Sequence, residues 1–211
     1  MKVGINGAVR DISDLKVGVS GAVRAVSEAY IGVSGAVKKV WPTFPVGSQV
    51  ILDEVKSYAD WWICPASGRW RIEGHGGGGA GGDLDLFGNT GGGGGGGSGE
   101  EYEATLNANE AIPYFIGECP GSEKNGQDTT FGDYTFAGGK AAKDTRGGDA
   151  SGSLATDGEN GQWQSIGGVG GYGNKNKPEQ TYGNGGKGFG IDYTPDEHLG
   201  LPGAIILTYL G

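Results

Sequence analysis

Histidine and aspartate are the residues of this chain with the clearest capacity for chemistry. The sequence has two histidines: His75 adjoins a glycine run, and His198 lies in the loop TPDEH. Neither forms part of a nucleophile elbow or of a metal-ligand pair such as H-x-x-x-H. Asp83 and Asp85 in GGDLDLFG offer carboxylate oxygens to a hard cation, but one Asp-x-Asp pair is more typical of solvated loop carboxylates. The sequence therefore predicts no catalytic residue, metal site or cofactor.

The two glycine runs and the acidic residues raise two further possibilities, phosphate binding and glycoside hydrolysis. A phosphate-cradling loop needs a Lys-Ser or Lys-Thr pair and a helix after its glycines, and both runs lack them. Paired carboxylates for glycoside hydrolysis are not excluded by spacing alone. We expect a protein that is not an enzyme, and a secreted polysaccharide-active enzyme stays an alternative.

Aromatic side chains in polar, glycine-flanked segments are the remaining candidates for function. Aromatic faces can stack on sugars, while neighbouring amide side chains bond the hydroxyl groups. The alternative is that these aromatic rings cover the edge of the core or close gaps between glycine segments. The predicted ligand-binding residues are Trp163, Tyr172, Asn174, Asn176, Tyr182 and Asn184, with Gln162 close by.

Charge and composition narrow the possible partners. Residues 1–47 hold six Lys/Arg and three Asp/Glu, whereas residues 48–211 hold ten and 22, a balance of −12. An acidic distal part argues against nucleic-acid binding. No apolar run approaches the about 18 residues that span a bilayer, and since MKVGINGAVRDIS has no apolar h-region we expect no secretory signal there. Cys64 and Cys119 form no redox or metal motif, so two buried free thiols are expected if the protein is assembled in a reducing cytoplasm, and a disulfide between them is the alternative.

The elements that position these residues begin with an internal repeat. VGINGAVRDIS, VGVSGAVRAVS and IGVSGAVKKVW recur every 14 residues, and each predicts two short strands around a two-residue turn. The turn pairs are Asn6-Gly7, Ser20-Gly21 and Ser34-Gly35. Isolated hairpins are marginal in water, so we expect them to pack on one another or on copies from neighbouring chains. A small meander that caps the main domain is the alternative. The prolines of Trp41–Pro45 suggest a boundary, giving predicted domains 1–47 and 48–211.

Residues 48–211 carry several strand patterns and no amphipathic helix. Trp70 and Ile72 alternate with charged residues, as in a half-buried strand. Further strands are predicted in VILDEV, EYEATLN, AIPYFIG, Thr129–Phe136 and PGAIILTYL. Short strands separated by turn-rich segments predict an all-β, antiparallel β-sandwich.

Glycine runs are inserted between these strands, chiefly 74–82 and 91–99. Flexible linkers are one interpretation. Collagen is excluded, because the runs lack a strict Gly-X-Y period and the chain has only eight prolines. The favoured interpretation is a bundle of polyglycine II helices, which pair their backbone groups with neighbouring helices because glycine permits close approach.

Several stretches of the chain together have a familiar pattern: the tandem VGVSGAVRAVSEAYIGVSGAVKKVW and the segments Trp62–Ala66, Thr130–Gly132, Gly138–Lys140 and Gly200–Ile206. On these residues the chain resembles the glycine-rich tail-fibre and tail-appendage proteins of tailed bacteriophages and prophages. The glycine-rich body is also similar to the extracellular domain of anaplastic lymphoma kinase-type receptors, which joins a jelly roll to packed polyglycine helices. That similarity implies a jelly-roll-like sandwich.

This resemblance implies a virion protein of the phage tail that is assembled in the host cytoplasm. Residues 1–47 would attach it to tail or baseplate proteins or trimerise it, and residues 48–211 would bind a glycan or protein of the bacterial surface. The family implies a homotrimer without membrane insertion. A purely structural baseplate or connector component is the second hypothesis.

Overall fold

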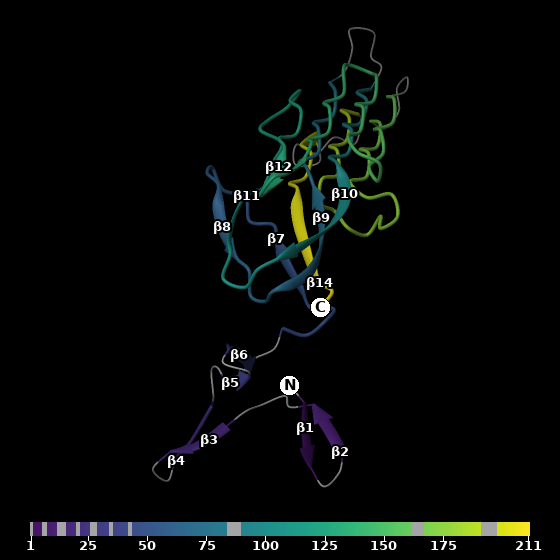
Figure 1. The fold of residues 1–211 in the computed structure, drawn as a ribbon. Helices are drawn as coiled ribbons and strands as arrows, with labels where there is room; N and C mark the ends of the chain where they lie inside the picture. The colour runs from purple at the N-terminus through teal and green to yellow at the C-terminus, as the bar shows by residue number, and fades with distance from the viewer. Residues whose placement is uncertain are drawn as a thin grey trace. The chain divides into compact units, whose positions relative to one another are not determined.

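A computed structural model describes residues 2–5, 8–11, 16–19, 22–25, 29–33, 36–41, 44–83, 90–161, 167–190 and 198–211. The chain divides into two compact units, Met1–Pro45 and Val46–Gly211. Figure 1 shows the strands of both units. The all-β prediction is confirmed, since among the described residues only His198 lies in a helical turn. Within those residues no helix is long and apolar enough to span a membrane.

The N-terminal unit contains three antiparallel strand pairs. Their bounds are β1 (Lys2–Ile5) with β2 (Ala8–Asp11), β3 (Lys16–Val19) with β4 (Ala22–Ala25), and β5 (Ala29–Val33) with β6 (Ala36–Trp41). Equivalent residues lie opposite one another in the three pairs, with Gly4 opposite Val9, Gly18 opposite Val23 and Gly32 opposite Val37, and the third pair also has a register shift between Ala29 and Tyr30. The predicted turn pairs Asn6-Gly7, Ser20-Gly21 and Ser34-Gly35 lie outside the described residues.

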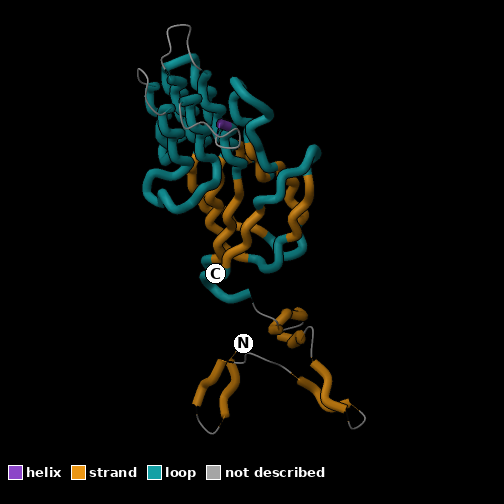
Figure 2. Tube along the Cα trace, turned by 180° about the vertical axis from the view of Figure 1, so that it is seen from behind, coloured by secondary structure: helices purple, strands orange, loops and turns teal. Residues whose placement is uncertain are grey.

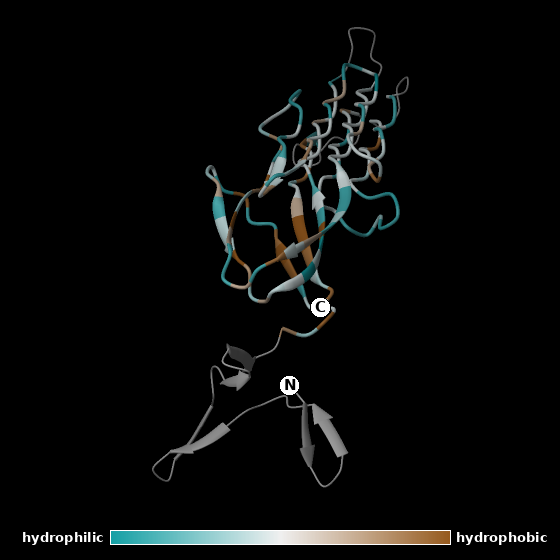
Figure 3. Cartoon of the chain, in the orientation of Figure 1, coloured by the Kyte–Doolittle hydropathy of each residue, from teal (hydrophilic) through white to brown (hydrophobic). Residues whose placement is uncertain are grey.

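The second unit, here called the body, contains two four-stranded antiparallel sheets. The first sheet has the order β10-β9-β14-β7 and the second β13-β12-β11-β8. The strands of the first sheet are β7 (Gln49–Leu52), β9 (Gly68–His75), β10 (Gly99–Leu106) and β14 (Ala204–Tyr209). Those of the second are β8 (Asp60–Ile63), β11 (Ala111–Phe115), β12 (Thr129–Phe131) and β13 (Tyr134–Phe136). The apolar terminal segment thus becomes β14, a central strand that Figure 3 shows in brown.

The inner faces of the two sheets share one aromatic core. Trp70 of β9 is completely buried, and its ring centroid lies 5.3 Å from that of Trp62 in β8. The Trp70 indole N–H also donates to the Ala66 carbonyl over 3.1 Å. At an edge strand of each sheet, Tyr102 of β10 stacks on Tyr134 of β13. The other large buried members of this core are Ile72, Ile112, Tyr114, Phe131, Phe136, Ile205 and Leu207.

We expect Trp70→Ala to lower the free energy of unfolding of the body by about 3–5 kcal/mol, because it leaves a cavity and an unpaired carbonyl. Trp61, the preceding neighbour of Trp62 on β8, has 61% of its surface exposed and is the matched control. Trp61→Ala should change stability by less than about 0.5 kcal/mol. Denaturant titration followed by circular dichroism measures both; equal losses would contradict this account of the core.

The glycine segments continue from the ends of the strands and lie side by side, as the teal tubes of Figure 2 show. Their backbone hydrogen bonds run between segments. In the first glycine run, 76–82, every third amide donates to the same neighbour: Gly76, Gly79 and Gly82 bond the carbonyls of Ser98, Gly95 and Gly92. The amides between them turn to other segments, Gly77 and Ala80 to Gln127 and Lys124, and Gly78 and Gly81 to Leu201 and His198.

The second glycine run, 91–97, repeats this three-residue pattern. Gly91, Gly94 and Gly97 donate to Phe189, Gly186 and Gly183. Both runs are buried, and none of their glycines has a φ in the left-handed region. Glycine is therefore required here for space: a Cβ on Gly94 would overlap the carbonyl oxygen of Gly79.

Candidate functional site

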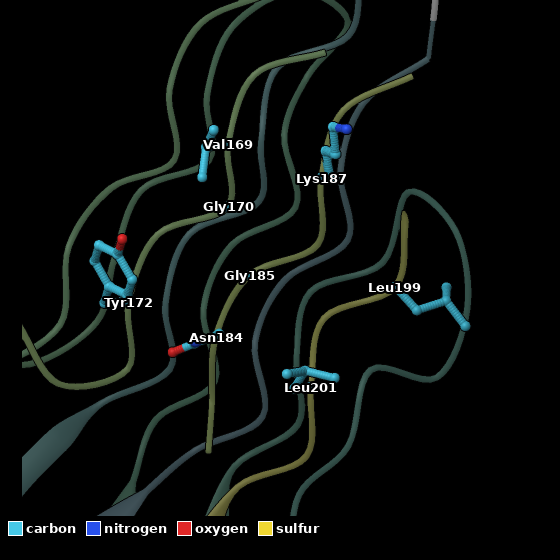
Figure 4. Close-up of a pocket in the computed structure, with 8 residues that line it drawn as sticks. All are labelled: Val169, Gly170, Tyr172, Asn184, Gly185, Lys187, Leu199 and Leu201. Carbon is cyan, nitrogen blue, oxygen red and sulfur yellow. The ribbon is translucent and has the colours of Figure 1, made fainter. Parts of the chain in front are cut away.

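A pocket of about 330 Å³ opens on the side of the glycine segments. Three segments line it, and Figure 4 shows their side chains. Val169 and Tyr172 come from the first, Asn184 and Lys187 from the second, and Leu199 and Leu201 from the third. Gly170 and Gly185 complete the lining.

Main-chain bonds fix these three segments to the glycine runs and to one another. The amide of Gly171 donates to Gly94 over 2.8 Å, and that of Gly186 donates to Gly79 over 2.8 Å. Gly185 bonds back to Gly171 at 2.9 Å, and the Leu201 amide reaches the Asn184 carbonyl at 2.7 Å. The pocket therefore has a backbone frame in which each segment is held from two sides.

The pocket lining combines apolar and hydrogen-bonding surface. Tyr172 is 41% exposed and Val169 47%, while Leu199 and Leu201 are each 39% exposed. The Asn184 Oδ1 accepts the Gly173 amide at 2.8 Å, which leaves the Asn184 Nδ2 as a donor. Such a lining, mostly apolar with a few fixed polar groups, is typical of ligand sites.

The structure brings together two of the six predicted ligand-binding residues, Tyr172 and Asn184. Tyr182 is half-buried, and its hydroxyl donates to Asp53 over 3.1 Å. Asn176 is exposed, and its backbone amide donates to the side-chain Oδ1 of Asn174. Trp163 and its neighbour Gln162 lie outside the described residues.

Asn174 is 2% exposed and is buried with Glu73 and His75, and the partly exposed Lys177 completes a group here called the Glu73 cluster. The Asn174 Nδ2 donates to the Glu73 Oε1 over 3.1 Å, and the Lys177 Nζ donates to the Oε2 over 2.7 Å. The His75 Nε2 also lies 3.1 Å from the Oε1. The Asn174 side chain thus ties its loop to the face of the first sheet.

The hydrogen bond from His75 is the main cause that lowers the pKa of Glu73 to about 2; burial opposes it, and the bond and charge of Lys177 lower the pKa further. The carboxylate is therefore ionised at neutral pH, and its charge is matched by the Lys177 ammonium. Glu73 is 5% exposed and His75 is completely buried, so neither reaches a bulky substrate. This arrangement suits a structural role, in which the loop of Asn174 is joined to the first sheet, more than catalysis by an acid–base pair.

Metal-binding chemistry finds no support in the part of the chain that the structure describes, where no three His, Cys, Asp or Glu residues could share an ion. Asp83 is exposed, with its Oδ1 3.7 Å from the His198 Nε2, and Asp85 lies outside the described residues. Cys64 and Cys119 are free thiols, and burial raises the pKa of Cys64.

Sequence reasoning missed the aliphatic members of the pocket. Val169, Leu199 and Leu201 are single apolar residues between glycines and polar residues, in GGVGGYG and HLGLPG. Isolated exposed aliphatic residues are common and carry little signal by themselves. Their significance appears only when three segments lie side by side.

No protein-family model matches the chain, and no curated protein is similar enough to be counted as a relative.

Proposed function

We propose that this chain is a phage tail-fibre or tail-tip protein that binds a bacterial surface receptor without catalysing a reaction. The observation that carries the proposal is the pocket in which Tyr172 and Asn184 meet. An exposed aromatic ring and an available amide on a backbone-fixed frame match a binding surface. The sequence resemblance to glycine-rich tail-fibre proteins supports the same function.

We propose that the glycine segments are polyglycine II helices packed against a jelly-roll-like sandwich. The three-residue recurrence of the hydrogen bonds from 76–82 and 91–97 supports this assignment, since such helices have three residues per turn and no internal bonds. The bundle would hold the receptor-binding residues in place, because each segment is bonded to several neighbours.

Residues 1–47 would form a repeat module that attaches the protein to the tail or baseplate. Their balance of six Lys/Arg against three Asp/Glu contrasts with the acidic body. We propose a homotrimer in the virion tail, in which hairpins of neighbouring chains pack together. A sedimentation mass of one chain for the full-length protein would contradict the trimer.

Binding of the full-length protein to bacterial cells tests the proposed function. The fluorescently labelled chain should adsorb to cells of a susceptible bacterium and compete with the particle for them. Tyr172→Ala should weaken adsorption about tenfold, as expected when an interfacial aromatic anchor is lost. Tyr58 is 65% exposed and does not line the pocket, so Tyr58→Ala is the matched control and should adsorb as wild type.

Two outcomes would go against the proposal. Failure of the full-length protein to adsorb to any bacterium that the particle infects would favour a structural baseplate or connector component. Release of reducing sugars from bacterial envelopes would favour a polysaccharide-active enzyme.

A further inference from the structure

The residues that line the pocket beside Tyr172 restrict the class of ligand that the pocket can bind. We propose that it binds one N-acetylated hexosamine residue of a neutral surface glycan. This inference rests on the proposed function and names the ligand class of the same site. The pocket volume of about 330 Å³ is at the small end for ligand sites, which suits a single sugar ring.

The Tyr172 ring supplies the surface for the apolar side of a sugar. Its segment is held in place by the bond from Gly171 to Gly94, and 41% of Tyr172 is exposed. A tyrosine side chain on a fixed segment has only two torsion angles to order when a sugar stacks on its ring. Tyr172 therefore accounts for recognition of a hexose ring but does not distinguish one hexose from another.

The aliphatic side chains explain why an acetamido group is favoured. Val169 lies on the same segment as Tyr172, while Leu199 and Leu201 lie on the third segment, as Figure 4 shows. The hydroxyl groups of a plain hexose gain nothing from these surfaces. An acetamido methyl buries apolar area against them, and one methyl group is worth roughly fourfold in affinity.

Polar groups in the same pocket match the amide of the acetamido group. The Asn184 Nδ2 is a donor, since the Oδ1 of that side chain is occupied by the Gly173 amide. Among the described residues, no backbone hydrogen bond engages the amide or the carbonyl of Gly170, whereas the Gly185 carbonyl packs against the Cα of Gly170. An acetamido group brings one donor and one acceptor, which pair with backbone and side-chain groups of this kind.

The charge of the body favours a neutral glycan. Residues 48–211 hold ten Lys/Arg and 22 Asp/Glu, so the body as a whole carries a balance of −12. A field of this sign repels polyanionic chains as they approach. Lys187 lines the pocket, but one cation does not reverse the charge of the whole body.

Calorimetric titration of the full-length protein with three trisaccharides tests the inference. The probes are a β-1,4-linked N-acetylglucosamine trimer, cellotriose as the counterpart with the same linkage and no acetamido groups, and sialyllactose as an anionic probe whose sialic acid also carries an acetamido group. We expect the N-acetylglucosamine trimer to bind at least roughly fourfold more tightly than cellotriose, because of its acetamido methyl groups, and more tightly than sialyllactose, because of the negative charge of the body. Equal or tighter binding of cellotriose or of sialyllactose would overturn the assignment.

Three variants connect that binding to the pocket. Asn184→Asp keeps the acceptor for the Gly173 amide and removes the Nδ2 donor, so it should retain the wild-type melting temperature and lose about tenfold in affinity. Tyr172→Ala should lose binding, and Tyr58→Ala should bind as wild type. Wild-type affinity of both Asn184→Asp and Tyr172→Ala would contradict the assignment of the binding site to this pocket.

Failure of this inference is distinguishable from failure of the proposed function. If the full-length protein adsorbs to cells but binds none of the trisaccharides, the ligand class is wrong and the receptor-binding function stands. If it does not adsorb to cells at all, the proposed function fails, whatever the trisaccharides do.

Discussion

Replacing Gly94 with alanine is expected to destabilise the body by about 3 kcal/mol, at the upper end of the range for overpacked sites. The added Cβ would overlap the carbonyl oxygen of Gly79, which itself accepts the Gly186 amide. Three segments would have to move apart, and the bonds from Gly94 to Gly186 and from Gly79 to Gly95 would stretch with them.

The sign of the stability change on Gly94→Ala distinguishes packed glycine segments from flexible ones. At a glycine whose φ lies outside the left-handed region, alanine ordinarily stabilises a protein by about 0.4–1 kcal/mol, because it restricts the unfolded chain. Gly94 is such a glycine. Flexible linker segments would therefore give a neutral or stabilised variant, whereas packed polyglycine helices give a strongly destabilised one.

The matched control is Gly47→Ala, which separates crowding from backbone strain. Gly47 has a φ of +87°, and a Cβ there would meet nothing within 4 Å. Its cost should be limited to about 1–2 kcal/mol of left-handed strain. Urea titration of both variants measures the difference, and a smaller loss for Gly94→Ala than for Gly47→Ala would contradict the packed bundle.

Neutralising the buried carboxylate in Glu73→Gln is expected to lower the stability of the body at pH 7 by on the order of 3 kcal/mol. The Glu73 pKa falls from 4.5 to about 2 on folding, chiefly through its bond to His75 and with help from Lys177. A folded-state pKa below the unfolded value stabilises the protein above that unfolded value. The contribution is then lost as the pH falls from about 4.5 through about 2.

The difference in unfolding free energy between wild type and Glu73→Gln should therefore be constant above pH 5 and shrink below it. Denaturant titrations from pH 2 to 7 measure that difference. Glu101→Gln is the control, because Glu101 lies directly opposite Glu73 on β10 and is exposed. Its exposed pair with Arg71 should contribute little. A pH-independent difference for Glu73→Gln would contradict the charge-based role of the Glu73 cluster.

Strand positions in the body follow closely from the sequence pattern. The alternation around Trp70 and Ile72 places both side chains in the core from β9, and the apolar segment 202–210 contains the central strand β14. Such predictions succeed because a strand with one buried face needs apolar residues at every second position. The strand β7, predicted from VILDEV, ends at Leu52 and so covers only the first part of that pattern.

The candidate site was less predictable, as Asn174 and Asn184 illustrate. Both are asparagines in polar, glycine-rich segments, and the sequence assigns both to ligand binding. Asn184 lines the pocket, whereas Asn174 is buried against Glu73, 101 residues away in the chain. Local composition is nearly the same at both positions, so the difference depends on which segment each loop meets.

The sequence by itself determined the all-β character of the body and the need for glycine in its long runs, because strand periodicity and missing side chains are local properties. Only the tertiary structure decided which segments lie side by side. The amides of the two glycine runs donate to several different neighbouring segments, all through the same backbone chemistry. Three consecutive amides, those of Gly76, Gly77 and Gly78, donate to the carbonyls of Ser98, Gln127 and Leu201. Local sequence does not distinguish such partners, and the pocket exists only where three of these segments meet.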